Sequence, residues 1–275
     1  MIHIKPVSEN KHFDSLKEAL DVDAVPIFFQ YLGAFPEYFD YIANQLIINL
    51  KDRKFADLVA ETETNILPLI HSGLPKSDDL HDWLSRYRQT PAFYYFQKDL
   101  FKIFFINIKL AYVFIALREA VKGWAIAAKK LPNTVNKNPA AQETETGIDP
   151  GQFIIDDTLI LASVNNRQVG NRPSGLIKSS PGAIEPDFLP EYMTRCRNEF
   201  WQHMKTEQCL MIRLGTEKII LQSLSMIPNL IFSPVNVVIR LSQKYPEFSE
   251  LLYLLSEHFP TYAIQRLLFS GFMLE

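Results

Sequence analysis

Apolar residues recur every three or four positions along most of the chain, which is the spacing of one face of an α-helix. Two such series are Tyr38, Ile42, Leu46 and Leu50, and Leu251, Leu254, Leu255 and Phe259. The alternation of apolar and polar residues that is typical of a β-strand is hard to find outside Gln152–Val164. The pattern predicts an all-α protein, and it leaves Gln152–Val164 open between a short helix, a strand and an extended segment.

Three prolines mark where helices are expected to begin. Pro36 and Pro190 are each followed by a glutamate, and Pro91 follows a threonine. Proline loses no needed N–H in the first turn of a helix, and a carboxylate there meets the positive end of the helix dipole. Thr90 is also a residue type that caps helix starts. We therefore expect helices to start close to these three prolines.

The segment from Leu100 to Leu117 is nearly as long and apolar as a membrane-spanning helix. Lys102, Asn107 and Lys109 interrupt it, and charged or amide groups are costly at membrane depth. No second segment of this kind accompanies it. We interpret it as a buried core helix and expect no membrane association.

A sequence repeat organises the chain. When Pro36 is aligned with Pro190, a shift of 154 positions, PEY falls on PEY and TETNIL falls on TEKIIL. Farther along, the stretch that begins at Thr90 aligns with the one that begins at Tyr245, with one inserted residue. Internal self-similarity at a fixed shift indicates a duplicated structural unit.

The repeat predicts three parts: a helical repeat over 1–128, a linker over 129–178 and a second helical repeat over 179–275. The linker is rich in proline, glycine and asparagine, and the apolar run Gln152–Val164 inside it is expected to dock on the repeats. Two homologous units in one chain usually pack about a pseudo-twofold axis, and a cleft between them is the default place for a ligand.

Composition narrows the function classes. The net charge is −3, so there is no basic surplus of the kind that nucleic-acid binding requires. Cys196 and Cys209 are the two cysteines, and they form neither a CxxC pair nor a zinc-ligand cluster. The first residues, MIHIKPVSENKHF, do not read as a secretory signal. We expect a cytoplasmic protein that binds no nucleic acid, and the residues predict no metal site.

The layout resembles the group I 2-haloacid dehalogenases, the DehI family, which consist of two all-helical, AhpD-like repeats joined by a long linker. The stretch VPIFFQYLGAFPEYFDYI (Val25–Ile42) is similar to the opening of that family's repeat. The resemblance implies hydrolysis of small 2-halo or similarly substituted carboxylic acids by direct attack of water, with an aspartate as general base and asparagine assistance. It implies no metal or organic cofactor.

The resemblance also suggests site residues. The stretch before the second repeat reads SSPGAIEPDFLPEY and has no aspartate at the family spacing, so the catalytic role falls to Asp187 only with a shifted loop. Asp187 is equally well placed to cap a helix. Asn107 is the matching catalytic asparagine, or else a structural amide in an apolar helix. The candidate substrate-binding residues are Asn198, Phe29 and Tyr31.

Two function hypotheses follow. The first is a DehI-like hydrolase, or a diverged relative, acting on a small carboxylic acid. The second is a protein that keeps the fold as a non-catalytic module for binding a small ligand or another protein, which the displaced aspartate favours. The oligomeric state stays open.

Overall fold

The computed structural model describes residues 2–89, 91–128, 147–154, 188–227 and 235–275, and the secondary structure in these ranges is helical. The first half contains α1 (Phe13–Leu20), α2 (Ile27–Gly33), α3 (Pro36–Lys51), α4 (Arg53–Gly73), α5 (Asp78–Ser85) and α6 (Pro91–Ala128). The later part contains α8 (Gly151–Ile154), α10 (Phe188–His203), α11 (Glu207–Leu224), α12 (Val235–Lys244), α13 (Phe248–Tyr253), a π-helical turn (Leu254–His258) and α14 (Phe259–Met273). The prediction of an all-α fold is confirmed for these residues.

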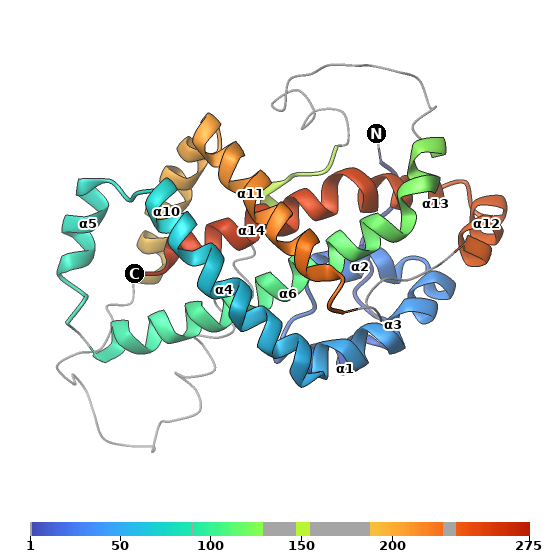
Figure 1. The fold of residues 1–275 in the computed structure, drawn as a ribbon, viewed down its shortest axis with the longest axis horizontal. Coiled ribbons are helices and arrows are strands. Elements are labelled where there is room, and N and C mark those ends of the chain that lie inside the picture. Colours follow the sequence, from blue (N-terminus) through green and yellow to red (C-terminus); the bar gives the residue numbers. More distant parts are fainter. Residues whose placement is uncertain (1, 90, 129–146, 155–187, 228–234) are drawn as a thin grey trace.

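Helices α6 and α14 lie side by side through the middle of the molecule, and we call them the central pair (Figure 1). Figure 1 shows α5 and α10 at one end of the central pair, and α3, α12 and α13 at the other. Helices α4 and α11 pack on each other and on both members of the central pair. The core is therefore one continuous apolar interior that runs the length of the central pair.

The long apolar helix predicted around Leu100–Leu117 is the middle of α6. The stretch Phe93–Lys122 is long and apolar enough to cross a membrane, but 78% of its most apolar window is buried inside the fold. A helix that is apolar on all sides must be covered on all sides, and here other helices of the same chain cover it. It serves as a core helix of this structure.

Helix starts follow the expected local chemistry. Helices α3 and α6 begin at Pro36 and Pro91, as predicted, and Pro190 lies in the first turn of α10. The side chain of Asp52 accepts a hydrogen bond from the backbone N–H of Lys54 at the start of α4. The hydroxyl of Thr206 accepts one from the backbone N–H of Cys209 at the start of α11. Both caps satisfy N–H groups that the helix itself leaves unpaired.

Burial follows the register of the sequence repeat. Helix α4 begins at Arg53 and α11 begins at Glu207, which is the same shift of 154 that relates Pro36 to Pro190. Aligned positions of α3 and α10 are also buried together: Tyr38 with Tyr192, Ile42 with Cys196, and Leu46 with Phe200. The repeated pattern in the sequence therefore corresponds to the same inward-facing positions in both helices.

Part of the linker docks, as predicted. Phe153 and Ile154 of α8 are fully buried, and α8 packs on α14 and α2. The start of the ambiguous run Gln152–Val164 is therefore helical, and residues 155–164 lie outside the described ranges.

The helical segment of the second half that packs along α6 is not a regular α-helix throughout. Between α13 and α14 the chain makes the π-helical turn, and Pro260 follows it in the first turn of α14. Proline has no N–H, and its ring clashes with the carbonyl four residues earlier in a regular α-helix. A widened turn before Pro260 relieves that clash and keeps the two segments nearly continuous.

Two helical glycines give a matched test of the packing. A Cβ atom at Gly271 of α14 would lie 2.5 Å from Cδ1 of Ile70 and 2.9 Å from Cε2 of Phe104, whereas one at Gly215 of α11 would meet nothing within 4 Å. We predict that Gly271→Ala destabilises the protein by about 1–3 kcal/mol, because Ile70 of α4 and Phe104 of α6 must move away from α14 to make room for the new methyl group. Gly215→Ala should be neutral, or stabilising by up to about 1 kcal/mol. Urea unfolding of dilute protein, followed by circular dichroism, checks both; equal midpoints for the two variants would contradict the close packing at Gly271.

Candidate functional site

Asn107, the predicted catalytic asparagine, lies near the middle of α6 and is only 2% exposed. A buried amide needs hydrogen-bond partners, since leaving it unpaired costs about 1–3 kcal/mol. Its partner is Arg266 of α14, whose Nε donates a hydrogen bond to Oδ1 of Asn107 at 2.8 Å. The two helices of the central pair are therefore joined by a polar contact inside an apolar core.

Arg266 also holds the docked linker segment. Its Nη1 donates a hydrogen bond to the backbone carbonyl oxygen of Phe153 at 3.3 Å, and the arginine is 3% exposed. A fully buried arginine is rare, because removing its charge from water is costly. Arg266 thus connects α6, α14 and α8 at one point, which we call the Arg266 site.

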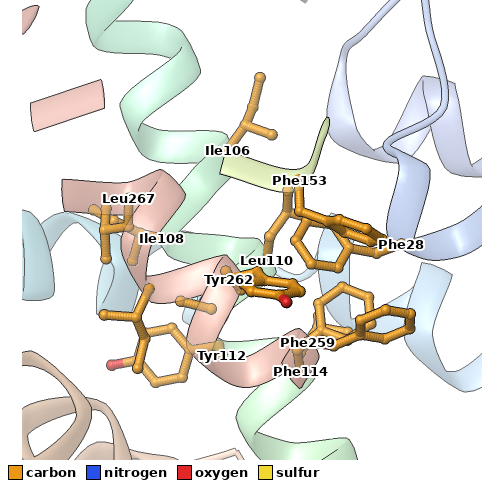
Figure 2. Close-up of a cluster of buried hydrophobic side chains, with 14 of the residues drawn as sticks. Phe28, Ile106, Ile108, Leu110, Tyr112, Phe114, Phe153, Phe259, Tyr262 and Leu267 are labelled. Carbon is orange, nitrogen blue, oxygen red and sulfur yellow. The ribbon is translucent and has the colours of Figure 1, made fainter. Parts of the chain in front are cut away.

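Phe153, whose carbonyl binds Arg266, belongs to a cluster of buried aromatic rings (Figure 2). Phe28 lies between Phe114 and Phe153, with ring centroids 4.7 and 5.1 Å away, and Phe153 lies 5.2 Å from Tyr262. Phe259 contacts the same cluster. Such rings exclude water, so the charge of Arg266 acts in a medium where electrostatic interactions are stronger than in solvent.

Of the predicted substrate-binding residues, Tyr31 and Phe29 are part of these surroundings. The ring of Tyr31 lies 5.6 Å from that of Phe153, and burial raises the pKa of its hydroxyl, so the phenol stays protonated. The ring of Phe29 lies 5.4 Å from that of Phe114. Both residues come from α2, which packs on α8. Helix α2 is part of Val25–Ile42, the stretch that resembles the opening of the dehalogenase repeat.

The other two candidates are placed differently. Asn198 is exposed on α10, as its repeat counterpart Asn44 is on α3. None of the contacts in the described part of the chain joins Asn198 to Asn107. Asp187, the candidate base, lies outside the described residues.

A row of polar side chains leads from the end of the π-helical turn along α14 to the Arg266 site. His258, Tyr262 and Arg266 are spaced by four residues and so share one face of the helix. The hydroxyl of Tyr262 lies 3.3 Å from Nδ1 of His258, whose Nε2 has no hydrogen-bond partner among the described residues. Burial lowers the pKa of His258, so its imidazole is neutral at pH 7.

The thiols do not add reactive groups. Both cysteines are buried and unpaired, and burial raises the pKa of Cys196 to about 12. A thiol with that pKa carries almost no thiolate at neutral pH. Within the described ranges, no three His, Cys, Asp or Glu side chains are grouped so that they could hold a metal ion.

A surface depression of about 710 Å³ lies elsewhere, between α1 and the segments on either side of it. Its lining mixes both charges, for example Lys11 and Lys17 with Glu9 and Asp14. Lys11 binds Asp40 at 2.6 Å, and Lys17 binds Asp14 at 2.6 Å. The depression contains none of the predicted site residues.

The sequence did carry a signal for Arg266 that the motif comparison missed. Arg266 is the one charged residue in the run from Pro260 to Leu274, which is otherwise apolar or neutral. A lone charge on a buried helix is a reliable indicator of a polar contact in the core. Phe153 carried no such signal, because an apolar residue in a linker does not reveal where it docks.

Comparison of the chain with protein-family models, with curated proteins and with solved structures finds no match.

The contact between Asn107 and Arg266 predicts strong energetic coupling. Asn107→Leu and Arg266→Met should each destabilise the protein by about 2–4 kcal/mol, because each leaves a buried polar partner behind. The double variant should cost about 1–3 kcal/mol less than the sum. Denaturant unfolding of the parent, the two single variants and the double variant measures this coupling.

Asn49→Leu is the control. Asn49 is a buried amide on α3 that donates to the carbonyl of Gln45, so the destabilisation it causes should simply add to that of Arg266→Met. Strict additivity for Asn107 would contradict the assignment.

His258 predicts a pH dependence of stability. Its folded pKa lies below the unfolded value of 6.5, so its contribution is fully present above about pH 6.5. The contribution is lost as the pH falls below that value, because the unfolded chain binds the proton first. His71, half-buried on α4, shifts in the same direction. We expect His258→Gln to lose less stability than the parent between about pH 7 and pH 5 in urea titrations. Parallel curves would show that His258 does not titrate on unfolding.

Proposed function

We propose that the chain is a diverged relative of the group I 2-haloacid dehalogenases, which hydrolyses a small substituted carboxylic acid bound at the Arg266 site. In this proposal the two helical repeats are related by a pseudo-twofold axis, and the site lies where the central pair meets the docked linker. The observation that carries the proposal is the buried contact of Arg266 with Asn107 in an aromatic interior.

Contacts between the two halves support the two-repeat arrangement, because a helix of each half is covered by helices of the other. Glu37 on α3 binds Lys244 of α12 at 2.9 Å, and Tyr38 contacts Phe248 of α13 with ring centroids 5.4 Å apart. In the other direction, Tyr192 on α10 contacts Trp83 of α5 and Phe96 of α6. Under the sequence repeat α10 corresponds to α3, so each half covers the same helix of the other half, as a twofold relation requires.

A carboxylate substrate suits the Arg266 site. The guanidinium is permanently charged and presents a planar fork that matches the two oxygens of a carboxylate. The rings around it form an apolar wall for the substituted carbon and exclude water that would compete with a single attacking molecule. Asn107, on the facing helix, is placed to orient the substrate through the same arginine.

The reaction follows from the resemblance. A water oxygen attacks the carbon next to the carboxylate, the C–O bond forms as the carbon–halogen bond breaks, and the halide leaves with the bonding electrons. A general base takes the proton of the water. The proposal gives this role to Asp187, which stands in the chain just before α10 and matches the family's base only with a shifted loop. No metal or organic cofactor is required.

A second candidate, a non-catalytic small-ligand module, is favoured by one observation. The amide oxygen of Asn107 already accepts a hydrogen bond from Arg266, so the polar pair is satisfied within the core. A site of this kind can hold a carboxylate without turning it over. The two candidates predict the same ligand class and differ in whether product forms.

Halide release from a panel of short 2-chloro and 2-bromo carboxylic acids tests the proposal. We expect turnover by the parent protein and a loss of at least about 100-fold in Asp187→Asn, because the base can no longer accept a proton. Arg266→Lys should raise KM more than it lowers kcat, since the charge remains but the fork is lost. Glu185→Gln, a neighbouring carboxylate, serves as the matched control and should retain activity.

The same panel separates the second candidate. A rise in thermal midpoint with these acids, without halide release, would favour the non-catalytic module. Neither release nor binding would reject the Arg266 site as a carboxylate site, and equal activity in Asp187→Asn would reject the assigned base.

A further inference from the structure

The outer face of α11 is apolar although it faces solvent. Leu210, Met211, Leu214 and Leu221 are all exposed, and Met211 is 60% exposed. Single exposed apolar residues are normal, but several on one helix face are typical of an interaction surface. We call this surface, together with the flanking Glu207 and Lys218, the α11 face.

The spacing along the α11 face is that of a helix-pairing seam. Glu207, Met211, Leu214, Lys218 and Leu221 are separated by four, three, four and three residues. This repeat of 3.5 keeps one stripe directed at a partner helix along its whole length. The stripe is therefore arranged for another helix lying along α11.

The fold itself does not require this stripe. On α4, the sequence repeat places Asp57, Ala60 and Thr64 at the positions of Met211, Leu214 and Lys218, and all three are exposed. Both helices occupy the same place in the repeat and pack on each other. Because α4 has small and polar residues at these three positions, the apolar side chains of Met211 and Leu214 serve something other than the packing of this chain, whereas Leu221 corresponds to the apolar Leu67.

Gly215, in the middle of α11, is further evidence that another chain binds this helix. Glycine in a helix interior costs about 1 kcal/mol relative to alanine. Nothing in the protein comes within 4 Å of the place where its Cβ would be, so no internal contact explains the glycine. A glycine without an internal reason fits a helix that another chain approaches closely.

We propose that the α11 face binds the α11 face of a second copy of this chain, with the two helices antiparallel about a twofold axis. In this register Met211 packs on Leu214 of the second copy, and Leu214 packs on Met211 of the second copy. Glu207 faces Lys218 of the second copy at both ends of the contact. Gly215 leaves room for Met211 of the second copy.

Charge selects this arrangement. Glu207 and Lys218 form no ion pair with any residue in the described ranges, so both are available to a partner. A parallel twofold pair would place Glu207 against Glu207 and Lys218 against Lys218, which is repulsive. The antiparallel pair brings opposite charges together twice. The surface is therefore complementary to itself in one direction only.

We expect the dimer to be weak because the contact surface is small. One pair of helices of this length buries less than the roughly 800 Å² per partner of a standard stable interface. We expect a monomer–dimer equilibrium with a Kd of about 10–100 µM. Sedimentation velocity of the full chain, from about 1 to 500 µM, should show the mean mass rising from monomer toward dimer.

Substitutions on the α11 face should abolish this shift. Leu214→Glu places a charge in the seam, and Gly215→Leu fills the space for the second copy's Met211, so each should weaken the dimer at least about tenfold. Both positions tolerate the change in the monomer, which circular dichroism checks. Ile48→Glu, at a 63% exposed apolar residue on α3, is the matched control and should leave the equilibrium unchanged.

Charge reversal tests the direction of pairing. Glu207→Lys and Lys218→Glu should each weaken the dimer at low salt, and the double reversal should restore it, since the opposite charges then meet again. A chain that stays monomeric at every concentration would overturn the proposal. A dimer that survives Leu214→Glu and Gly215→Leu would overturn it as well, because it would use another surface.

Discussion

The structure depends on the burial of two helices that are apolar on nearly every side. Residues 103–121 of α6 and all of α14 are buried or half-buried, and each helix is the largest single cover of the other. Their contact sets the long axis of the molecule, and the remaining helices finish the cover. Helices α4 and α11 cover one side, and α2 and the docked α8 cover another. Helices α5 and α10 lie at one end of the central pair, and α3, α12 and α13 lie at the other. Burial of this apolar surface is the dominant favourable term in folding.

The polar contact inside that core supplies specificity. Apolar side chains allow two helices to slide along each other at little cost, whereas a buried hydrogen bond to a charged group is satisfied in one register only. Arg266, by binding both Asn107 and the carbonyl of Phe153, specifies where α14 lies against α6 and where α8 docks. The same contact is the centre of the proposed carboxylate site. Stability and function would then compete for one arginine.

Sequence periodicity predicted the helical class, because the spacing of Tyr38, Ile42 and Leu46 states which side of a helix is buried. The prolines likewise predicted the starts of α3 and α6, at Pro36 and Pro91. Periodicity does not state which helix covers which. The contacts of α3 with α12 and of α10 with α5 could therefore not be foreseen, and neither could the place where Phe153 docks. Asn107 was predicted as a polar residue that needs a partner, but its partner lies 159 positions away on another helix.

The contact between α3 and α12 has a consequence for the order in which the protein can be completed. Glu37 on α3 and Lys244 on α12 are in contact although 207 residues separate them in the chain. At a synthesis rate of about 5–20 residues per second, α3 leaves the ribosome roughly 10–40 s before the helix that covers it. During that interval α3 can pack on α1, α2 and α4, but the side that meets α12 has no native cover, and the loop to be closed spans 207 of the 275 residues. The contact between α3 and α12 is therefore among the last to form during synthesis.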